Sequence, residues 1–187
     1  MKRPLHSLSQ PKLTQGGVAA VEFALVALPF FLLILGVMEF GRLMYLWNTV
    51  QEVTRNAVRQ AVVTDFSSTT AIAAIQNLAV FRTTVGPLPM SSEITSTRVN
   101  IRYLNAAGNV SNPMPSDPGD NISACLDAGR VNSCIRFVEV CVSTNNTCAA
   151  GGAISFAPMI PLFSQFATLT IPLSTVRMPA ESLGFSP

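Results

Sequence analysis

The sequence predicts an α+β fold, in which a long N-terminal transmembrane helix extends into a small head built around an antiparallel sheet. Three observations lead to this prediction. An apolar run covers residues 18–38, an apolar stripe at helical spacing continues to about residue 63, and segments with β-strand alternation follow. We therefore expect a cytoplasmic leader (1–17), a transmembrane helix (18–40), a continuation of that helix outside the cytoplasm (41–63) and a disulfide-bonded α+β head (64–187).

The apolar run has the length and the flanks of a membrane-spanning helix. Residues 18–38 contain one charged residue, Glu22, and would rise about 31 Å as an α-helix, which matches the hydrocarbon core of a bilayer. Lys2, Arg3 and Lys12 precede the run, so the positive-inside rule places the N-terminus in the cytoplasm and the head on the exported side of the membrane. Two alternatives stay open: a cleavable secretory signal peptide, for which the run is long, and a plain anchor, which does not account for Glu22.

Glu22 is the most informative residue of the run. A carboxylate costs about 3 kcal/mol at the centre of a membrane helix and less near an interface, so such residues normally have a partner. A cut between Gly17 and Val18 would supply one, because it would create an α-amino group one helical turn before Glu22. The amine and the acid would pair within one chain or between neighbouring subunits of a helical bundle.

Other residues of the run favour contact between helices. Ala20, Ala24 and Ala27 lie at spacings of four and three, so they share one face, and small residues allow membrane helices to approach closely. Pro29 removes a helix hydrogen bond in the middle of the run and is expected to bend the helix.

Residues 16–45 closely resemble the TadE-like family, the minor pilin-like proteins of the tight-adherence (Flp) pilus machinery. The positions that match the family pattern are Gly17, Glu22, Phe23, Pro29, Glu39, Gly41 and Arg42. The resemblance continues to about residue 62, and a looser likeness appears in residues 156–178.

The resemblance implies a pilin-like architecture and a function. A prepilin peptidase of the inner membrane would cut between Gly17 and Val18, which makes Glu22 and Phe23 the fifth and sixth mature residues. The mature protein would act with other pilin-like subunits and the Tad assembly platform in pilus assembly, and so in adhesion and biofilm formation. The alternatives are a membrane-anchored extracytoplasmic binding module with no role in a fibre, and a pseudopilin outside the Tad group.

The helix is expected to continue beyond the membrane. Its apolar stripe comprises Phe40, Leu43, Met44, Trp47, Val50, Ala57 and Ala61. Its polar positions are Arg42, Gln51, Glu52, Arg55 and Arg59. The stripe would face the head, and Tyr45 and Trp47 suit a membrane–water interface. Two shorter helices with a break near Gly41 are the alternative.

The head is expected to hold one further helix and three strands. Residues 69–82 have the pattern of an amphipathic helix. In residues 98–104, apolar and polar side chains alternate as in a β-strand, which places Val99, Ile101 and Tyr103 on one face. Residues 135–143 form a strand apolar enough to be central. Residues 167–178 form a third strand, in which Pro172 indicates an edge or a bulge. Residues 105–133 are rich in turn-forming residues and predict a long surface loop.

All four cysteines (Cys125, Cys134, Cys141 and Cys148) lie on the exported side, where an even number predicts two disulfides. Three pairings are possible. We favour Cys125–Cys134 and Cys141–Cys148, because each closes a short loop, and the nested pairing stays open. Zinc is the rival interpretation, but the chain has no Cys-x-x-Cys unit and no histidine after His6.

The composition argues against an enzyme. The single histidine lies in the leader, so the mature chain has no Ser–His or Cys–His dyad, and no phosphate-binding loop or cofactor site is predicted. Asp117 and Asp120 are expected to be solvated in a loop, with a weak calcium site as the alternative. The scattered arginines form no basic patch, so no nucleic-acid partner is expected.

Overall fold

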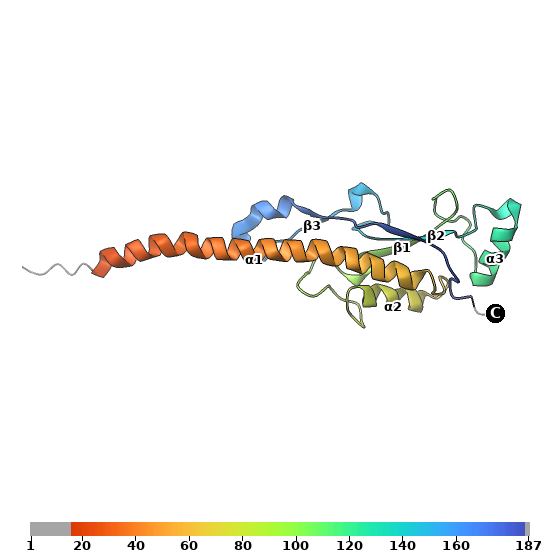
Figure 1. Cartoon of the computed structure of the whole chain (residues 1–187), viewed down its shortest axis with the longest axis horizontal. Helices are drawn as coiled ribbons and strands as arrows, with labels where there is room; N and C mark the ends of the chain where they lie inside the picture. The colour runs from red at the N-terminus through yellow and green to blue at the C-terminus, as the bar shows by residue number, and fades with distance from the viewer. Residues whose placement is uncertain (1–15, 186–187) are drawn as a thin grey trace, which may run out of the picture. The chain divides into compact units, whose positions relative to one another are not determined.

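The structure is a computed structural model, and it describes residues 16–185 (Figure 1). Its contacts divide the chain into two compact units, of which the first ends at Met38 and the second begins at Glu39. The predicted leader lies outside the described residues, apart from Gly16 and Gly17. The second unit includes residues 39–61 of the long helix, so this part of the helix belongs to the head.

The elements follow one another along the chain as an α+β arrangement, as predicted. The α-helices are α1 (Gly16–Ala61), α2 (Thr69–Ala79) and α3 (Pro118–Leu126). The short 3-10 helices are η1 (Ser96–Arg98), η2 (Ala128–Arg130), η3 (Ala150–Gly152) and η4 (Pro161–Thr168). The strands are β1 (Val99–Leu104), β2 (Phe137–Val142), β3 (Ile154–Ser155), β4 (Thr170–Ile171) and β5 (Val176–Pro179).

Helix α1 is continuous through both Pro29 and Gly41, so the long helix is confirmed and the alternative of two shorter helices is wrong. The part of α1 within the second unit forms one wall of the core. The apolar α1 residues with no exposed surface there are Leu46, Val50, Val53, Ala57 and Ala61. They join one buried apolar cluster with residues of the sheet and of α2, such as Val138, Val140 and Ile75. Burial of this stripe favours packing of the helix against the head.

Three α1 side chains depart from the predicted stripe. Phe40 and Trp47 were placed on the apolar face that meets the head, but both are exposed. Arg42 was placed on the polar, solvent-facing side, but it is buried. The predicted stripe included Phe40 and Trp47 and left out Leu46, whereas the buried face includes Leu46 beside the correctly predicted Leu43.

The main sheet has the order β1-β2-β5, with both pairs antiparallel. The central position predicted for residues 135–143 is confirmed, because β2 lies between the other two strands. Val99, Ile101 and Tyr103 are paired with Val142, Val140 and Val138, so they share one face as expected. On the other face, Glu139 of β2 accepts hydrogen bonds from Arg102 of β1 at 2.9 Å and from Arg177 of β5 at 2.8 Å.

The third predicted strand, residues 167–178, is wrong as a single element. Its first residues belong to η4, β4 pairs with β3 in a separate two-stranded sheet, and β5 alone joins the main sheet. Pro172 directly follows β4, and because it has no N–H it cannot donate to a strand ladder. Ser174 has a φ of 46°, which interrupts extended geometry before β5.

The predicted surface loop of residues 105–133 contains a helix, α3, so that prediction is also wrong in part. Asp117 caps α3, with its Oδ1 accepting from Asp120 N at 2.8 Å, and Pro118 occupies the first turn. Asp120 is bound by Arg130 Nη2 at 2.8 Å. The aspartates expected to be solvated loop residues therefore start a helix and tie it to η2.

The C-terminal tail returns to the end of α1. Leu183 is buried, and its N–H donates to the Val62 carbonyl at 3.1 Å. Gly184 has a φ of 82°, and a Cβ there would lie 2.4 Å from Asp65 N. Only glycine allows this close passage of the tail over the segment that follows α1.

Candidate functional site

The first part of α1 carries the residues predicted to act in processing and assembly. Gly17 and Val18 lie in its first turn, and Glu22 and Phe23 follow one turn later. The predicted Gly17–Val18 bond therefore lies in the first described turn of α1, one turn before Glu22.

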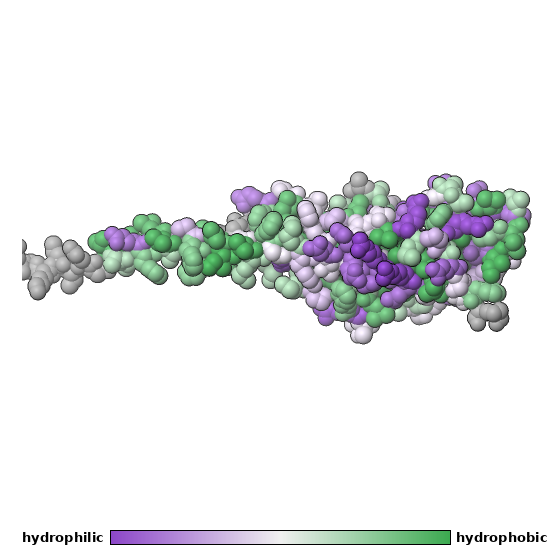
Figure 2. Space-filling view, in the orientation of Figure 1, coloured by the Kyte–Doolittle hydropathy of each residue, from purple (hydrophilic) through white to green (hydrophobic). Residues whose placement is uncertain are grey.

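Helix α1 is the one helix among the described residues that is long and apolar enough to cross a membrane. Its first half exposes large apolar side chains, and Figure 2 shows this part as largely hydrophobic surface. A surface of this kind is stable in lipid and unstable in water. The helix is therefore a candidate membrane anchor, and a single-pass arrangement fits its length.

Glu22 is exposed on this apolar surface. The ion pairs found within residues 16–185 do not include it. Ala20 and Ala24 are also exposed, and Ala27 is half-buried, so the small-residue face remains open within the chain. An acid and a small-residue face that the chain leaves uncovered suit contact with another helix.

A second group of residues, which we call the charge cluster (Glu39, Arg42 and Glu93), joins α1 to the head. Arg42 Nη2 lies 2.8 and 3.1 Å from the two carboxylate oxygens of Glu93. Arg42 Nη1 lies 3.1 Å from Glu39 Oε1. All three side chains are at most 6 % exposed. A guanidinium that binds a carboxylate through both oxygens gives a strong and directional ion pair.

Backbone groups complete the charge cluster. Arg42 Nε donates to the Met90 carbonyl at 2.9 Å, and Nη1 donates to the Ala157 carbonyl at 2.8 Å. In return, the N–H of Ala157 donates to Glu93 at 2.9 Å and the N–H of Met159 donates to Glu39 at 2.9 Å. The guanidinium carbon also lies 4.7 Å from the ring centroid of Phe156. Two distant loops are thereby fastened to one position on the helix.

The surroundings of Glu93 keep its carboxylate ionised. Burial by itself would raise the pKa of Glu93, but hydrogen bonds from Ser91, from backbone N–H groups and from Arg42 outweigh it and lower the pKa below its usual value. Arg42 therefore faces an ionised Glu93 at neutral pH, and the N–H of Ala157 gives that carboxylate a further donor.

The charge cluster is not apparent from the sequence. Glu39 and Arg42 match the family pattern without an indicated partner, and no local pattern marks Glu93 as a site residue. The one local indication in the sequence is that Glu39 and Arg42 lie three residues apart directly after the apolar run, a spacing that allows an ion pair on a helix. The other partners lie 51 and 115 residues further on, which no local pattern shows.

The cysteines form two disulfides, Cys125–Cys134 and Cys141–Cys148, the pairing that the sequence analysis favours. The first links α3 to the segment before β2, and the second links β2 to the loop before η3. Each closes a short loop in the head, which restricts the unfolded chain and stabilises the fold.

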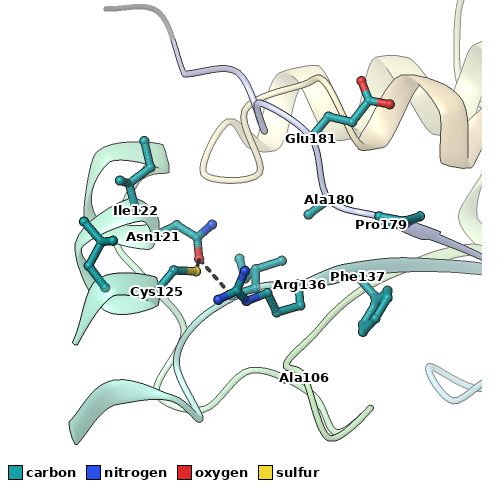
Figure 3. A pocket seen from close by; sticks show the side chains of 11 residues that line it. Ala106, Asn121, Ile122, Cys125, Arg136, Phe137, Pro179, Ala180 and Glu181 are labelled. Carbon is teal, nitrogen blue, oxygen red and sulfur yellow. Dashed lines mark hydrogen bonds between the residues drawn. The ribbon is translucent and has the colours of Figure 1, made fainter. Parts of the chain in front are cut away.

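A surface pocket lies beside α3, between that helix and the ends of β2 and β5 (Figure 3). Asn121 is engaged within the fold, because its Oδ1 accepts from Ile135 N at 2.8 Å, and Cys125 is held in a disulfide. Arg136 and Glu181 are the charged residues in its lining, and their charged ends point apart in Figure 3.

A family model described as TadE-like protein matches residues 17–59. Neither the curated proteins nor the solved structures include a match to the chain. The matched segment starts at the predicted cleavage residue Gly17 and includes Glu22 as well as Glu39 and Arg42 of the charge cluster. It points to a protein associated with a Tad pilus system and confirms the resemblance found in the sequence. This chain therefore carries a TadE-like segment, which extends over residues 17–59.

Proposed function

We propose that the chain is a pilin-type subunit of the tight-adherence (Flp) pilus machinery and acts in pilus assembly, and so in surface adhesion and biofilm formation. The observation that carries the proposal is the position of Gly17, Glu22 and Phe23 at the start of an exposed apolar helix within the TadE-like segment. In this proposal the first half of α1 spans the inner membrane, and the head lies outside the cytoplasm.

Processing supplies the partner of the acid. A prepilin peptidase cuts after Gly17, and the new α-amino group of Val18 lies one turn from Glu22. An unpaired charge in lipid is costly. Neighbouring helices therefore favour the one relative position, or docking register, at which the amine of one subunit pairs with the acid of the next. The open face of Ala20, Ala24 and Ala27 lets the helices approach closely. The role is structural and involves no catalytic chemistry or cofactor.

The alternative is a membrane-anchored binding module. It is favoured by one observation, the self-contained second unit of residues 39–187, with two disulfides and a surface pocket of its own. In that case the apolar helix would serve only to hold the head at the membrane.

Exchanging the anchor separates the two functions. We expect that replacing residues 1–38 by an unrelated single-pass anchor of the same orientation leaves the head folded at the membrane but abolishes pilus formation. The junction must precede Glu39, because a later one would remove Glu39, or both Glu39 and Arg42, and break the charge cluster. Piliation is measured by electron microscopy of a deletion strain carrying the exchanged chain, with the native chain as control. Normal piliation from the exchanged chain would favour the binding module.

A further inference from the structure

Two loops of the head present the same pair of residues next to the charge cluster. One contains Pro89 and Met90, the other Pro158 and Met159, and we call residues 87–91 and 157–160 the Pro-Met loops. The charge cluster holds both, because Arg42 binds the Met90 and Ala157 carbonyls and Glu39 binds the Met159 N–H. Glu39 is covalently bonded to Met38, so both loops are held close to the end of the apolar run.

The Pro-Met loops expose apolar side chains, while the charge cluster that holds them is buried. Met90 is 67 % exposed and Met159 is 72 % exposed, whereas Glu39, Arg42 and Glu93 are buried beneath them. This is the reverse of an ordinary water-facing surface, where charged side chains lie outside.

The sequence around both loops is free of charge. No charged residue lies between Arg82 and Glu93, and none lies between Glu139 and Arg177. Charged side chains are the groups that lipid excludes most strongly, and both segments lack them. Arg82, whose Nε donates to the Pro87 carbonyl at 3.0 Å, is an exposed charge beside the first loop, and its guanidinium suits the level of the lipid headgroups.

The backbone of Met90 adds an independent observation. Its φ is 62°, in the left-handed region where a residue other than glycine or asparagine is disfavoured by about 1 kcal/mol or more. A methionine held there, with its side chain outside the core, contributes little to the stability of the head. Strained residues of this kind are typical of positions that serve an interaction.

We propose that the two Pro-Met loops contact the surface of the membrane that residues 18–38 span, with Met90 and Met159 inserted at the boundary between lipid headgroups and acyl chains. Apolar side chains at that boundary gain the free energy of leaving water, and the buried charge cluster keeps the nearby charges out of lipid. The contact would fix the head against the bilayer. The proposal rests on the membrane span of the proposed function, but not on cleavage or assembly.

Depth-dependent fluorescence quenching tests the contact, because the chain has a single tryptophan, Trp47. In a Trp47→Phe background, the full chain carries Met90→Trp or Met159→Trp and is reconstituted into phosphatidylcholine–phosphatidylglycerol vesicles with nitroxide-labelled lipids. We expect shallow labels to remove most of the emission of both variants, with a shift to shorter wavelength. Leu126→Trp, at a residue 84 % exposed in α3, is the control and should keep its emission.

Phe23→Trp in the same background reports the membrane span itself. Quenching of Phe23→Trp by deep labels, without quenching of Met90→Trp and Met159→Trp, would overturn the loop contact and leave the proposed function standing. A shift to shorter wavelength without quenching would mean that protein covers the loops, a second copy of this chain included, and would also overturn it. Absence of quenching at Phe23→Trp would overturn the span and the contact together.

Discussion

The Glu22→Ala variant is expected to insert into the membrane as the native chain does and to lose pilus formation. Insertion should persist, because removal of a carboxylate from an apolar helix lowers the cost of placing it in lipid. Assembly should fail, because the α-amino group of Val18 would lose the acid that specifies its docking register. We expect at least about a tenfold fall in surface pili, equivalent to about 1.4 kcal/mol of lost coupling. Membrane fractionation and electron microscopy of the same cells measure the two effects.

Two further variants make this result specific. Glu22→Gln keeps the size of the side chain and removes its charge, so it should behave as Glu22→Ala does. Glu52→Ala removes an exposed acid from the same helix outside the apolar run and should leave piliation unchanged. Normal piliation in Glu22→Gln would show that the charge has no role in assembly.

The Arg42→Ala variant is expected to destabilise the head by roughly 3–5 kcal/mol, because it leaves two buried carboxylates without their cation. It also removes the hydrogen bonds to the Met90 and Ala157 carbonyls, which hold both Pro-Met loops to α1. Urea unfolding of the full chain in detergent, followed by Trp47 fluorescence, measures the loss.

An exposed arginine provides the matched control. Arg130→Ala breaks an ion pair with the same 2.8 Å separation, but the Arg130 side chain is 38 % exposed. It should therefore cost about 1 kcal/mol or less. The double variant Arg42→Met with Glu93→Gln removes one buried carboxylate together with the guanidinium. It should therefore recover part of the stability that Arg42→Ala loses. Equal destabilisation by Arg42→Ala and Arg130→Ala would contradict the structural role of the charge cluster.

Features set by local pattern were predictable from the sequence. The long helix, the second helix and the central strand each follow from periodicity within one segment. The end of α2 was the exception, because the helix ends at Ala79, three residues before the expected end, with Val80 as its C-cap, and Phe81 adopts a φ of 59°. Such a stop depends on backbone geometry that hydrophobic periodicity does not record.

Features set by distant contacts were not predictable. Arg42 was assigned to the solvent face because arginine is usually exposed, whereas here two carboxylates, two carbonyls and the ring of Phe156 surround it. Helix α3 was missed because the composition of residues 105–133 is that of a loop. What starts the helix is one capping side chain, Asp117, and what holds it is the Cys125–Cys134 disulfide.

The N-terminus of the mature protein tests the central claim most directly. The protein is extracted from membranes of cells that contain the prepilin peptidase, and its first residues are determined by N-terminal sequencing. The proposed function predicts a chain that begins at Val18, with Glu22 in the fifth position, and a chain that still carries residues 1–17 when the peptidase gene is deleted. A mature chain that begins at Met1 in the presence of the peptidase would contradict the account.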